Sequence, residues 1–192
     1  MRKLILKMSV SLDGFVSGPN GEADWIQRTG GPDTLDRLVR ELRQAGVHIM
    51  GSTSYHAMAS FYPAATVPFA PPMNETPKVV FTQKGLELPS ARAASEPEGS
   101  WGNPRIADGD LVDEVNRLKA EPGQAIMAHG GVAFAHSLIR QGLVDEYWLT
   151  LRPVALGAGL PLFPEGYDPR YLECISADTF ERGAMAIVYR PA

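Results

Sequence analysis

Residues 125–147 (AIMAHGGVAFAHSLIRQGLVDEY) constrain the fold of this chain more than any other stretch. A four-residue apolar run with the length of a buried strand comes first, and Gly130 and Gly131 follow it. Apolar residues then recur at spacings of three and four, as in a helix, up to Gly142, where a helix end is expected. A second apolar run follows at residues 143–151. The stretch therefore predicts a strand–helix–strand unit with two glycines at its first turn.

These paired glycines have a functional interpretation. Without a Cβ atom, Gly130 and Gly131 let a ligand approach the backbone closely. The helix that follows points unpaired backbone N–H groups at the same place, which suits a phosphate. A tight turn that required glycine is the alternative, and for this turn taken alone it is the simpler interpretation.

The remaining apolar patterns alternate between strands and helices. Strands are predicted at residues 3–10, 47–50 and 78–82, and a closing hairpin at 171–178 and 184–190. Alternating strands and helices indicate an α/β three-layer sandwich, with a mostly parallel central sheet flanked by helices. The closing hairpin adds an antiparallel edge to that sheet.

Helix boundaries and loops can also be predicted. Asp33 or Thr34 is expected to cap a helix that Gly46 ends. Its buried stripe is expected to consist of Leu35, Leu38, Val39 and Leu42. A further helix is expected to begin at Asp108 or Asp110. The segments 61–77 and 153–169, rich in proline or glycine, are expected to be loops, and residues 83–103 to be irregular with one short strand near 91–95.

Composition bounds the classes of function. A hydrophobic share of 44% in 192 residues supports one sizeable core, and no repeat or linker divides the chain, so residues 1–192 are expected to form a single domain. The net charge is −4 and the basic residues are scattered, which argues against a nucleic-acid-binding surface. No segment approaches the length of a membrane span, and no signal peptide is recognisable. Cys174 is the sole cysteine, so a reducing, cytoplasmic location is expected.

Three predicted strands end in small or hydroxyl residues. These ends are Gly51-Ser52-Thr53-Ser54, Thr82-Gln83-Lys84 and Gly130-Gly131. Ligands of open α/β sheets bind beyond the carboxyl ends of the strands, where hydroxyls, backbone N–H groups and a lysine would form a phosphate-binding rim. A ligand that spans all three ends is long, as a dinucleotide is. None of the three matches the G-x-G-x-x-G fingerprint, and each alone is ordinary turn chemistry.

In this order the segments resemble the dihydrofolate reductase-like fold. The closer likeness is to the reductase (C-terminal) domain of the bifunctional deaminase–reductase of riboflavin biosynthesis, and to its stand-alone relatives. The matching pieces are MSVSLDGFVSGPNGEADWI, HIMGSTSYHAM, KVVFTQKG and HGGVAFAHSLIRQGLVDEYWLTLRPVALGAGLPLF. The resemblance implies an NADPH-binding reductase, usually a homodimer, that acts on a small molecule.

The resemblance also implies a cofactor-binding set at the strand ends and the loop after the first strand. This set consists of Gly14, Gly51, Ser52, Thr53, Ser54, Thr82, Gln83, Lys84, His129, Gly130, Gly131 and Val132. Within it, Gly130 and Gly131 would hold the pyrophosphate, and in relatives their peptide bond is often cis. Lys84 lies in the segment that matches the neighbourhood of the adenosine 2′-phosphate. Gly14 matches the start of the loop that covers the nicotinamide.

Three residues on the loop after the first strand are catalytic candidates. Hydride transfer needs little acid–base machinery, because the nicotinamide supplies the hydride and the protein positions the reactants. Asp13 and Asp24 are candidates for a proton donor or substrate anchor, with Asx-turn chemistry as the alternative for both. Trp25 could stack on a flat substrate ring or fill the loop as a hydrophobic plug.

Two departures from the family pattern refine the expected function. Ser52 stands where many relatives carry arginine, so the preference for NADPH over NADH rests mainly on Lys84. Folate-reducing relatives carry an acid on the first helix that protonates the pterin. In this chain the corresponding position falls near Gly30, where there is no carboxylate, so dihydrofolate is not the expected substrate. We expect an NADPH-dependent reductase of a small, flat, pterin- or pyrimidine-like heterocycle. The alternative is a dinucleotide-binding or sensing protein without turnover, and no metal site is predicted.

Overall fold

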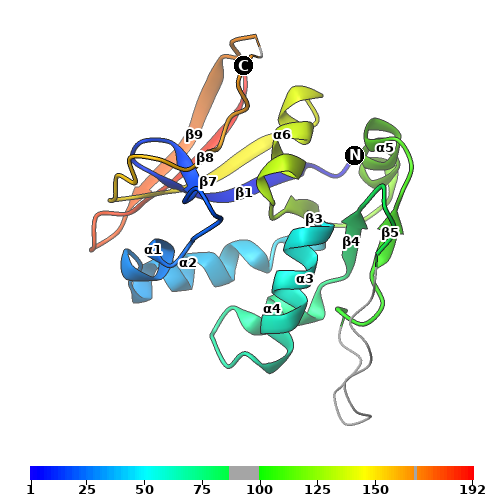
Figure 1. The fold of residues 1–192 in the computed structure, drawn as a ribbon, viewed down its shortest axis with the longest axis horizontal. Coiled ribbons are helices and arrows are strands. Elements are labelled where there is room, and N and C mark those ends of the chain that lie inside the picture. Colours follow the sequence, from blue (N-terminus) through cyan, green and yellow to red (C-terminus); the bar gives the residue numbers. More distant parts are fainter. Residues whose placement is uncertain (87–99, 167) are drawn as a thin grey trace.

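The structure is a computed structural model that describes residues 1–86, 100–166 and 168–192. It is built around a central sheet (Figure 1). In the described residues, the sheet has the order β5-β4-β3-β6-β1-β7-β10-β9. Its parallel strands are β1 (Leu4–Ser11), β3 (Ala45–Gly51), β4 (Lys78–Phe81), β5 (Arg105–Ala107), β6 (Ala125–Ala128) and β7 (Glu146–Arg152). The hairpin of β9 (Leu172–Thr179) and β10 (Met185–Pro191) joins antiparallel to β7. The predicted α/β class and the antiparallel edge are therefore confirmed.

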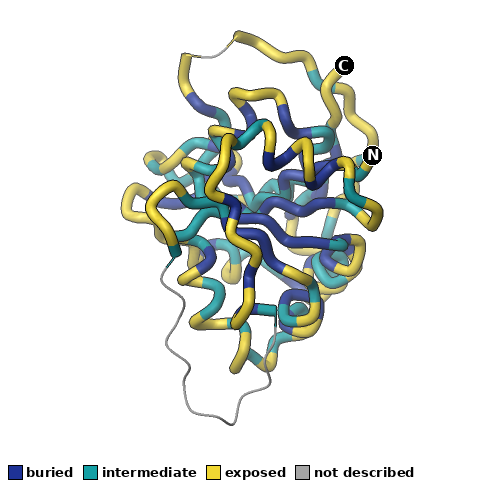
Figure 2. The backbone as a smooth tube through the Cα atoms, turned by 90° about the vertical axis from the view of Figure 1, so that its right-hand side faces the viewer, coloured by how far each residue is buried: buried dark blue, intermediate teal, exposed yellow. Residues whose placement is uncertain are grey.

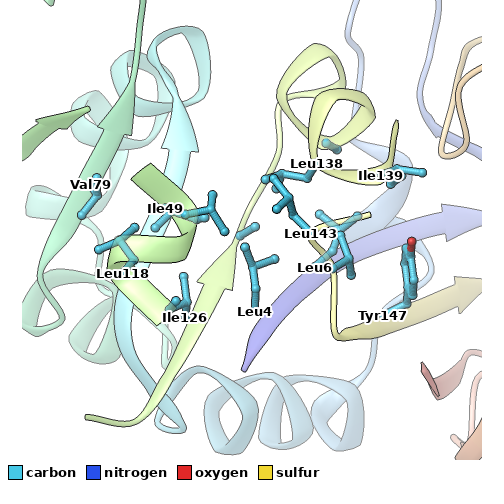
Figure 3. Packing of buried hydrophobic residues seen from close by; sticks show 14 of the residues in the cluster. Leu4, Leu6, Ile49, Val79, Leu118, Ile126, Leu138, Ile139, Leu143 and Tyr147 are labelled. Carbon is cyan, nitrogen blue, oxygen red and sulfur yellow. The ribbon is translucent and has the colours of Figure 1, made fainter. Parts of the chain in front are cut away.

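Helices cover both faces of this sheet, below it and above it in the view of Figure 1. On one face lie α2 (Pro32–Leu42), α3 (Ser52–Phe61) and α4 (Ala70–Glu75), and on the other α5 (Leu111–Ala120) and α6 (Val132–Arg140). Successive strand residues point to opposite faces, so two apolar clusters form. Figure 3 shows the cluster on the α5–α6 side, with Leu118 of α5 and Leu138 of α6 directed toward the strands. In Figure 2 the dark, buried strands run through the middle, between exposed outer turns.

Short elements occupy segments that were predicted as loops. Residues 61–77 contain η1 (Tyr62–Ala64) and α4, and each has a proline within its first two positions. Proline is accepted there because the first turn of a helix does not use its N–H group. Segment 153–169 contains β8 (Leu160–Pro161), which pairs with β2 (Phe15–Ser17). The strand suggested at 91–95 lies outside the described residues.

Helix α2 differs most from its prediction. It begins at Pro32 after Gly31, whose N–H donates to the Thr34 hydroxyl over 2.8 Å, and it ends at Leu42 rather than at Gly46. Leu42 is buried as expected, but Leu35 is exposed. The polar residues Thr34 and Glu41 are buried instead. The side of α2 that faces the sheet is therefore partly polar, which indicates a site rather than a simple core contact.

None of the helices in the described part of the chain combines the length and the apolar character that a membrane span requires.

Candidate functional site

The carboxyl ends of β4, β3, β6 and β1 lie along one edge of the sheet, because these neighbouring strands are parallel. Helix α3 starts directly after β3, with Gly51 as its N-cap, and α6 starts after β6, with Gly131 as its N-cap. No side chain caps either helix. Two helix N-termini therefore present free backbone N–H groups at the same edge, which we name the carboxyl edge, and such ends attract anions.

The Gly130-Gly131 turn is packed closely against the turn after β3. Its peptide bond is cis, and the N–H of Gly51 donates to the Gly130 carbonyl over 3.4 Å. A Cβ atom on Gly131 would lie 3.1 Å from Oγ of Ser54. Gly130 is buried, whereas Gly131 and Ser54 keep part of their surface exposed. The backbone is therefore open to a ligand at Gly131, at a point where a side chain would crowd it.

The third predicted strand end lies on the next strand. The register sets Phe81 of β4 opposite Gly51, so Thr82 follows at the same edge. The Thr82 hydroxyl donates to the Gly85 carbonyl over 2.9 Å and accepts from the Lys84 N–H over 3.3 Å, which folds this segment into a turn. Gln83 and Lys84 are exposed. The structure thus brings all three predicted strand ends to the carboxyl edge.

Asp13 connects the turn after β1 to the loop at residues 156–157. Its carboxylate accepts hydrogen bonds from the Ser11 hydroxyl over 2.6 Å and from the N–H groups of Gly157 over 2.7 Å and Leu156 over 3.1 Å. These donors, the Ser11 hydroxyl foremost, lower the pKa of Asp13 to about 2. The neighbouring Gly14 has a φ of +88°, the left-handed region that favours glycine. A carboxylate that is ionised and held in this way fits an anchor better than a proton donor.

Asp24 and Trp25 lie at the start of α1 (Trp25–Arg28). The Asp24 carboxylate is exposed and lies 2.8 Å from the guanidinium of Arg28. Trp25 is buried, and its indole N–H donates to the Glu22 carbonyl over 3.2 Å. Both residues line a cavity of about 400 Å³, which we name the outer cavity, between residues 18–29 and 154–158. Trp25 therefore fills the loop and also forms a wall of this cavity.

A second cavity, the inner cavity, lies between the sheet and α2 and has a volume of about 220 Å³. Its lining comes from several elements: Lys7, Met8, Ser9, Ile26, Thr34, Arg37, Leu38, Glu41, Tyr62, His129, Thr150, Arg152 and Phe180. It reaches the residue before the Gly-Gly turn, since His129 is part of its lining. The sequence prediction missed this cavity, although Lys7 and Ser9 on β1, and Thr150 and Arg152 on β7, alternate as one polar strand face.

Most charges of the inner cavity are paired. Both oxygens of the buried Glu41 carboxylate accept, one from Lys7 Nζ over 2.5 Å and the other from Arg37 Nε over 2.6 Å. Arg37 also donates to Asp178 over 2.7 Å. Arg152 is different: it is 8% exposed, and its Nε and Nη1 have no hydrogen-bond partner among the described residues. Burial lowers the pKa of Arg152, but an arginine side chain remains protonated in proteins.

His129 lines this cavity and pairs with His48, which is fully buried. Its Nε2 lies 2.7 Å from Nδ1 of His48, and Nε2 of His48 lies 3.4 Å from the Pro72 carbonyl. A carbonyl can only accept, so Nε2 of His48 carries the proton and its Nδ1 accepts from His129. Burial lowers the pKa of His48 to about 3 and that of His129 well below its usual value. Both rings are therefore neutral at neutral pH, and Nδ1 of His129 is an acceptor.

Comparison with known proteins supplies the family. The sequence profile of the RibD C-terminal domain matches residues 2–186. The chain belongs to the RibD C-terminal domain family. Two relatives from Bacillus subtilis (strain 168) match it: the uncharacterized protein YyaP is 31% identical over 98% of this chain and 94% of its own length, and the uncharacterized protein YwjB is 27% identical over 85% and 84%.

Solved structures confirm the fold expected for this RibD C-terminal domain family member. A putative riboflavin biosynthesis protein from Shewanella sp. PV-4 has a TM-score of 0.77 at 21% identity, over 99% of both chains. A pyrimidine reductase-like protein from Corynebacterium diphtheriae has a TM-score of 0.68 at 13% identity, over 100% of this chain and 92% of that one. A dihydrofolate reductase from Enterococcus faecalis, complexed with NADP(H), has a TM-score of 0.61 at 15% identity, over 98% and 96%. The resemblance to the dihydrofolate reductase-like fold is thus confirmed.

Proposed function

We propose that this family member is a reductase that binds NADPH at the carboxyl edge and reduces a small, flat, pyrimidine- or pterin-like heterocycle in the inner cavity. The observation that carries the proposal is the meeting of two helix N-termini with glycine N-caps at Gly51 and Gly131, next to a cavity whose lining includes His129, the residue before Gly130. Bound NADPH would supply the hydride.

The residues at the carboxyl edge fit a dinucleotide. A diphosphate needs close access to backbone N–H groups, and a side chain on Gly131 would close that access, because its Cβ would lie 3.1 Å from the Ser54 hydroxyl. The hydroxyls of Ser52, Thr53 and Ser54 surround the N-terminus of α3 and can donate to phosphate oxygens. Lys84 is exposed, where its ammonium could meet a 2′-phosphate, so we propose NADPH as the cofactor, with NADH not excluded.

The chain's own groups would then position the substrate and keep water from it. Lys7, Glu41 and Arg37 form a fixed set of donors and acceptors along one side of the inner cavity. Leu38 and Tyr62 supply apolar and aromatic contacts for a flat ring. Ile26 lines the inner cavity and its neighbour Trp25 lines the outer one, so the segment that carries both would limit the access of water to the substrate.

A cofactor titration tests the proposal. NADPH and NADH are added to the protein, and quenching of tryptophan fluorescence is followed to saturation. Gly131→Ala is expected to weaken NADPH binding about tenfold, equivalent to about 1.4 kcal/mol, because the new methyl group crowds Ser54. Ser137→Ala, on an exposed position of α6, is the matched control and is expected to bind as the wild type does. Absence of saturable quenching at millimolar NADPH contradicts the proposal.

The second candidate is a dinucleotide-binding or sensing protein that does not turn over. The state of Asp13 favours it, because an ionised, anchored carboxylate is a poor proton donor. Loss of NADPH absorbance with a panel of pterins and pyrimidines separates the two candidates. Binding without oxidation across the panel supports the sensor, and oxidation with any of these rings supports the reductase.

We also propose a homodimer, as the family resemblance implies. Light scattering after size-exclusion chromatography measures the mass in solution, and a mass of one chain at micromolar concentration contradicts this part of the proposal.

A further inference from the structure

The guanidinium of Arg152 is the group in the inner cavity whose charge no described residue balances. Arg152 is the last residue of β7, and its Nε and Nη1 are shielded from solvent without an acceptor among the described residues. A buried cation that lacks both water and a counter-charge is costly, and proteins keep such a group where a ligand completes its contacts.

The neighbouring carboxylates are already engaged. Both oxygens of Glu41 are bound to Lys7 and Arg37. The two oxygens of Asp33, at the start of α2, accept from the N–H groups of Thr34 and Glu181, each over 2.8 Å. Gly30 lies beside Nη1, since a Cβ built on it would be 3.4 Å away, and glycine offers no side-chain acceptor. Of the three cations in the lining, Lys7 is paired with Glu41, and Arg37 is paired with Glu41 and with Asp178 outside the lining, so Arg152 remains as the unbalanced positive charge.

The size and the rest of the lining limit what can occupy this site. A volume of about 220 Å³ lies below the usual range of ligand pockets, roughly 300–1,000 Å³, and suits one substituted ring. Leu38, Tyr62 and Phe180 line the cavity with apolar and aromatic surface. Arg152 presents donors in a planar fork that matches the oxygens of a carboxylate or phosphate.

We propose that Arg152 selects substrates that carry an oxyanion, so that the inner cavity takes a small, ring-bearing anion with its oxyanion against the end of β7. That the bound anion is a substrate rests on the proposed reductase function, whereas the binding site itself does not depend on that function. Arg152 thereby determines specificity: a neutral ring of the same shape leaves the guanidinium unpaired and binds more weakly.

A matched pair of probes tests this without any cofactor. Orotate and uracil share a pyrimidine ring and differ by one carboxylate. Each is titrated into ¹⁵N-labelled full-length protein while the Nε–Hε resonance of Arg152 is followed, together with calorimetric affinities. We expect orotate to shift this resonance and to bind at least about tenfold more tightly than uracil. Equal affinities, or an unmoved Arg152 resonance, overturn the proposal.

Variants separate charge from packing. Arg152→Gln is expected to lose most orotate affinity and to leave uracil affinity unchanged, while Arg152→Lys retains part of the orotate affinity. Arg190→Gln, which removes an arginine from an exposed ion pair with Glu173, is the control and should match the wild type. If Arg152→Gln does not fold, the wild-type resonance and Arg152→Lys still decide, since unchanged orotate affinity in Arg152→Lys together with an unmoved wild-type resonance contradicts the proposal.

Inorganic phosphate identifies the kind of oxyanion. Competition with orotate supports the site and indicates a phosphate-bearing substrate, and a lack of competition supports a carboxylate. This test does not depend on NADPH. If the protein binds orotate but not NADPH, the Arg152 site is supported and the reductase proposal is contradicted. If it binds NADPH but not orotate, the reductase proposal is supported and the selection of anions by Arg152 is contradicted.

Discussion

Leu6 and Lys7 are adjacent on β1 and face two different environments. Leu6 is fully buried in the apolar cluster beneath α5 and α6. Lys7 points to the other face, where it meets Glu41 of α2 across the inner cavity. One face of the same strand thus stabilises the fold by burying apolar side chains. The other face carries charged side chains that line the inner cavity. The contrast indicates that the α2 face of β1 and β7 is shaped for a ligand.

The largest expected effect concerns the apolar face. Leu6→Ala should lower the free energy of unfolding by about 4 kcal/mol, because it removes buried methyl groups and leaves a cavity. Urea denaturation followed by circular dichroism measures the change. Leu12→Ala, at an exposed leucine, is the control and should change stability by less than about 0.5 kcal/mol. Similar losses in the two variants would contradict the assignment of Leu6 to the core.

On the polar face, Glu41→Gln should lower the free energy of unfolding by about 3 kcal/mol. The substitution leaves the buried Lys7 ammonium and the Arg37 guanidinium without the carboxylate between them. Glu173→Gln breaks the exposed pair with Arg190 and should cost less than about 1 kcal/mol. The same urea titration compares them, and equal costs would mean that Glu41 is not the buried counter-charge.

Arg152→Met should act in the opposite direction. Replacing a buried, unpaired guanidinium with an apolar chain of similar length is expected to raise the free energy of unfolding by about 1 kcal/mol. Lys7→Met, which removes a paired cation, should destabilise instead. Thermal unfolding in the absence of small anions checks both signs. A loss of stability in Arg152→Met would show that Arg152 already has a counter-charge in the free protein.

The smallest effect concerns Asp13, at the surface. Its pKa in the folded protein, about 2, lies below the value of about 4 in an unfolded chain, so its contribution is present above pH 4 and is lost as the pH falls toward 2. Asp13→Asn should flatten the stability profile in that window. It should also speed hydrogen exchange at the N–H groups of Leu156 and Gly157, whereas Asp24→Asn should not. Unchanged exchange in Asp13→Asn would contradict the anchoring role.

The carboxyl edge could be predicted from the sequence because its signals are local. Strand, paired glycines and helix follow one another within residues 125–140, and backbone chemistry alone gives them meaning. The order of the three strand ends along the chain then placed them on neighbouring parallel strands, as the register of β3 and β4 bears out.

The inner cavity could not be predicted in this way, since its residues come from segments far apart in the chain. Lys7 and Arg152 line the same cavity only because β1 and β7 pair, and Glu41 joins the lining only because α2 crosses that face. Glu41 on a helix and Lys7 on a mostly apolar strand each have a simpler interpretation as surface residues. Asp13 likewise accepts two of its three hydrogen bonds from residues more than 140 positions away.

The hydrogen bonds of Asp13 also affect the shape of the outer cavity. Leu156 forms part of one wall of the outer cavity, and Asp13 ties that wall to the turn after β1. Asp13 therefore couples the outer cavity to the end of β1, because any widening of this cavity on the Leu156 side has to stretch or break hydrogen bonds to its carboxylate.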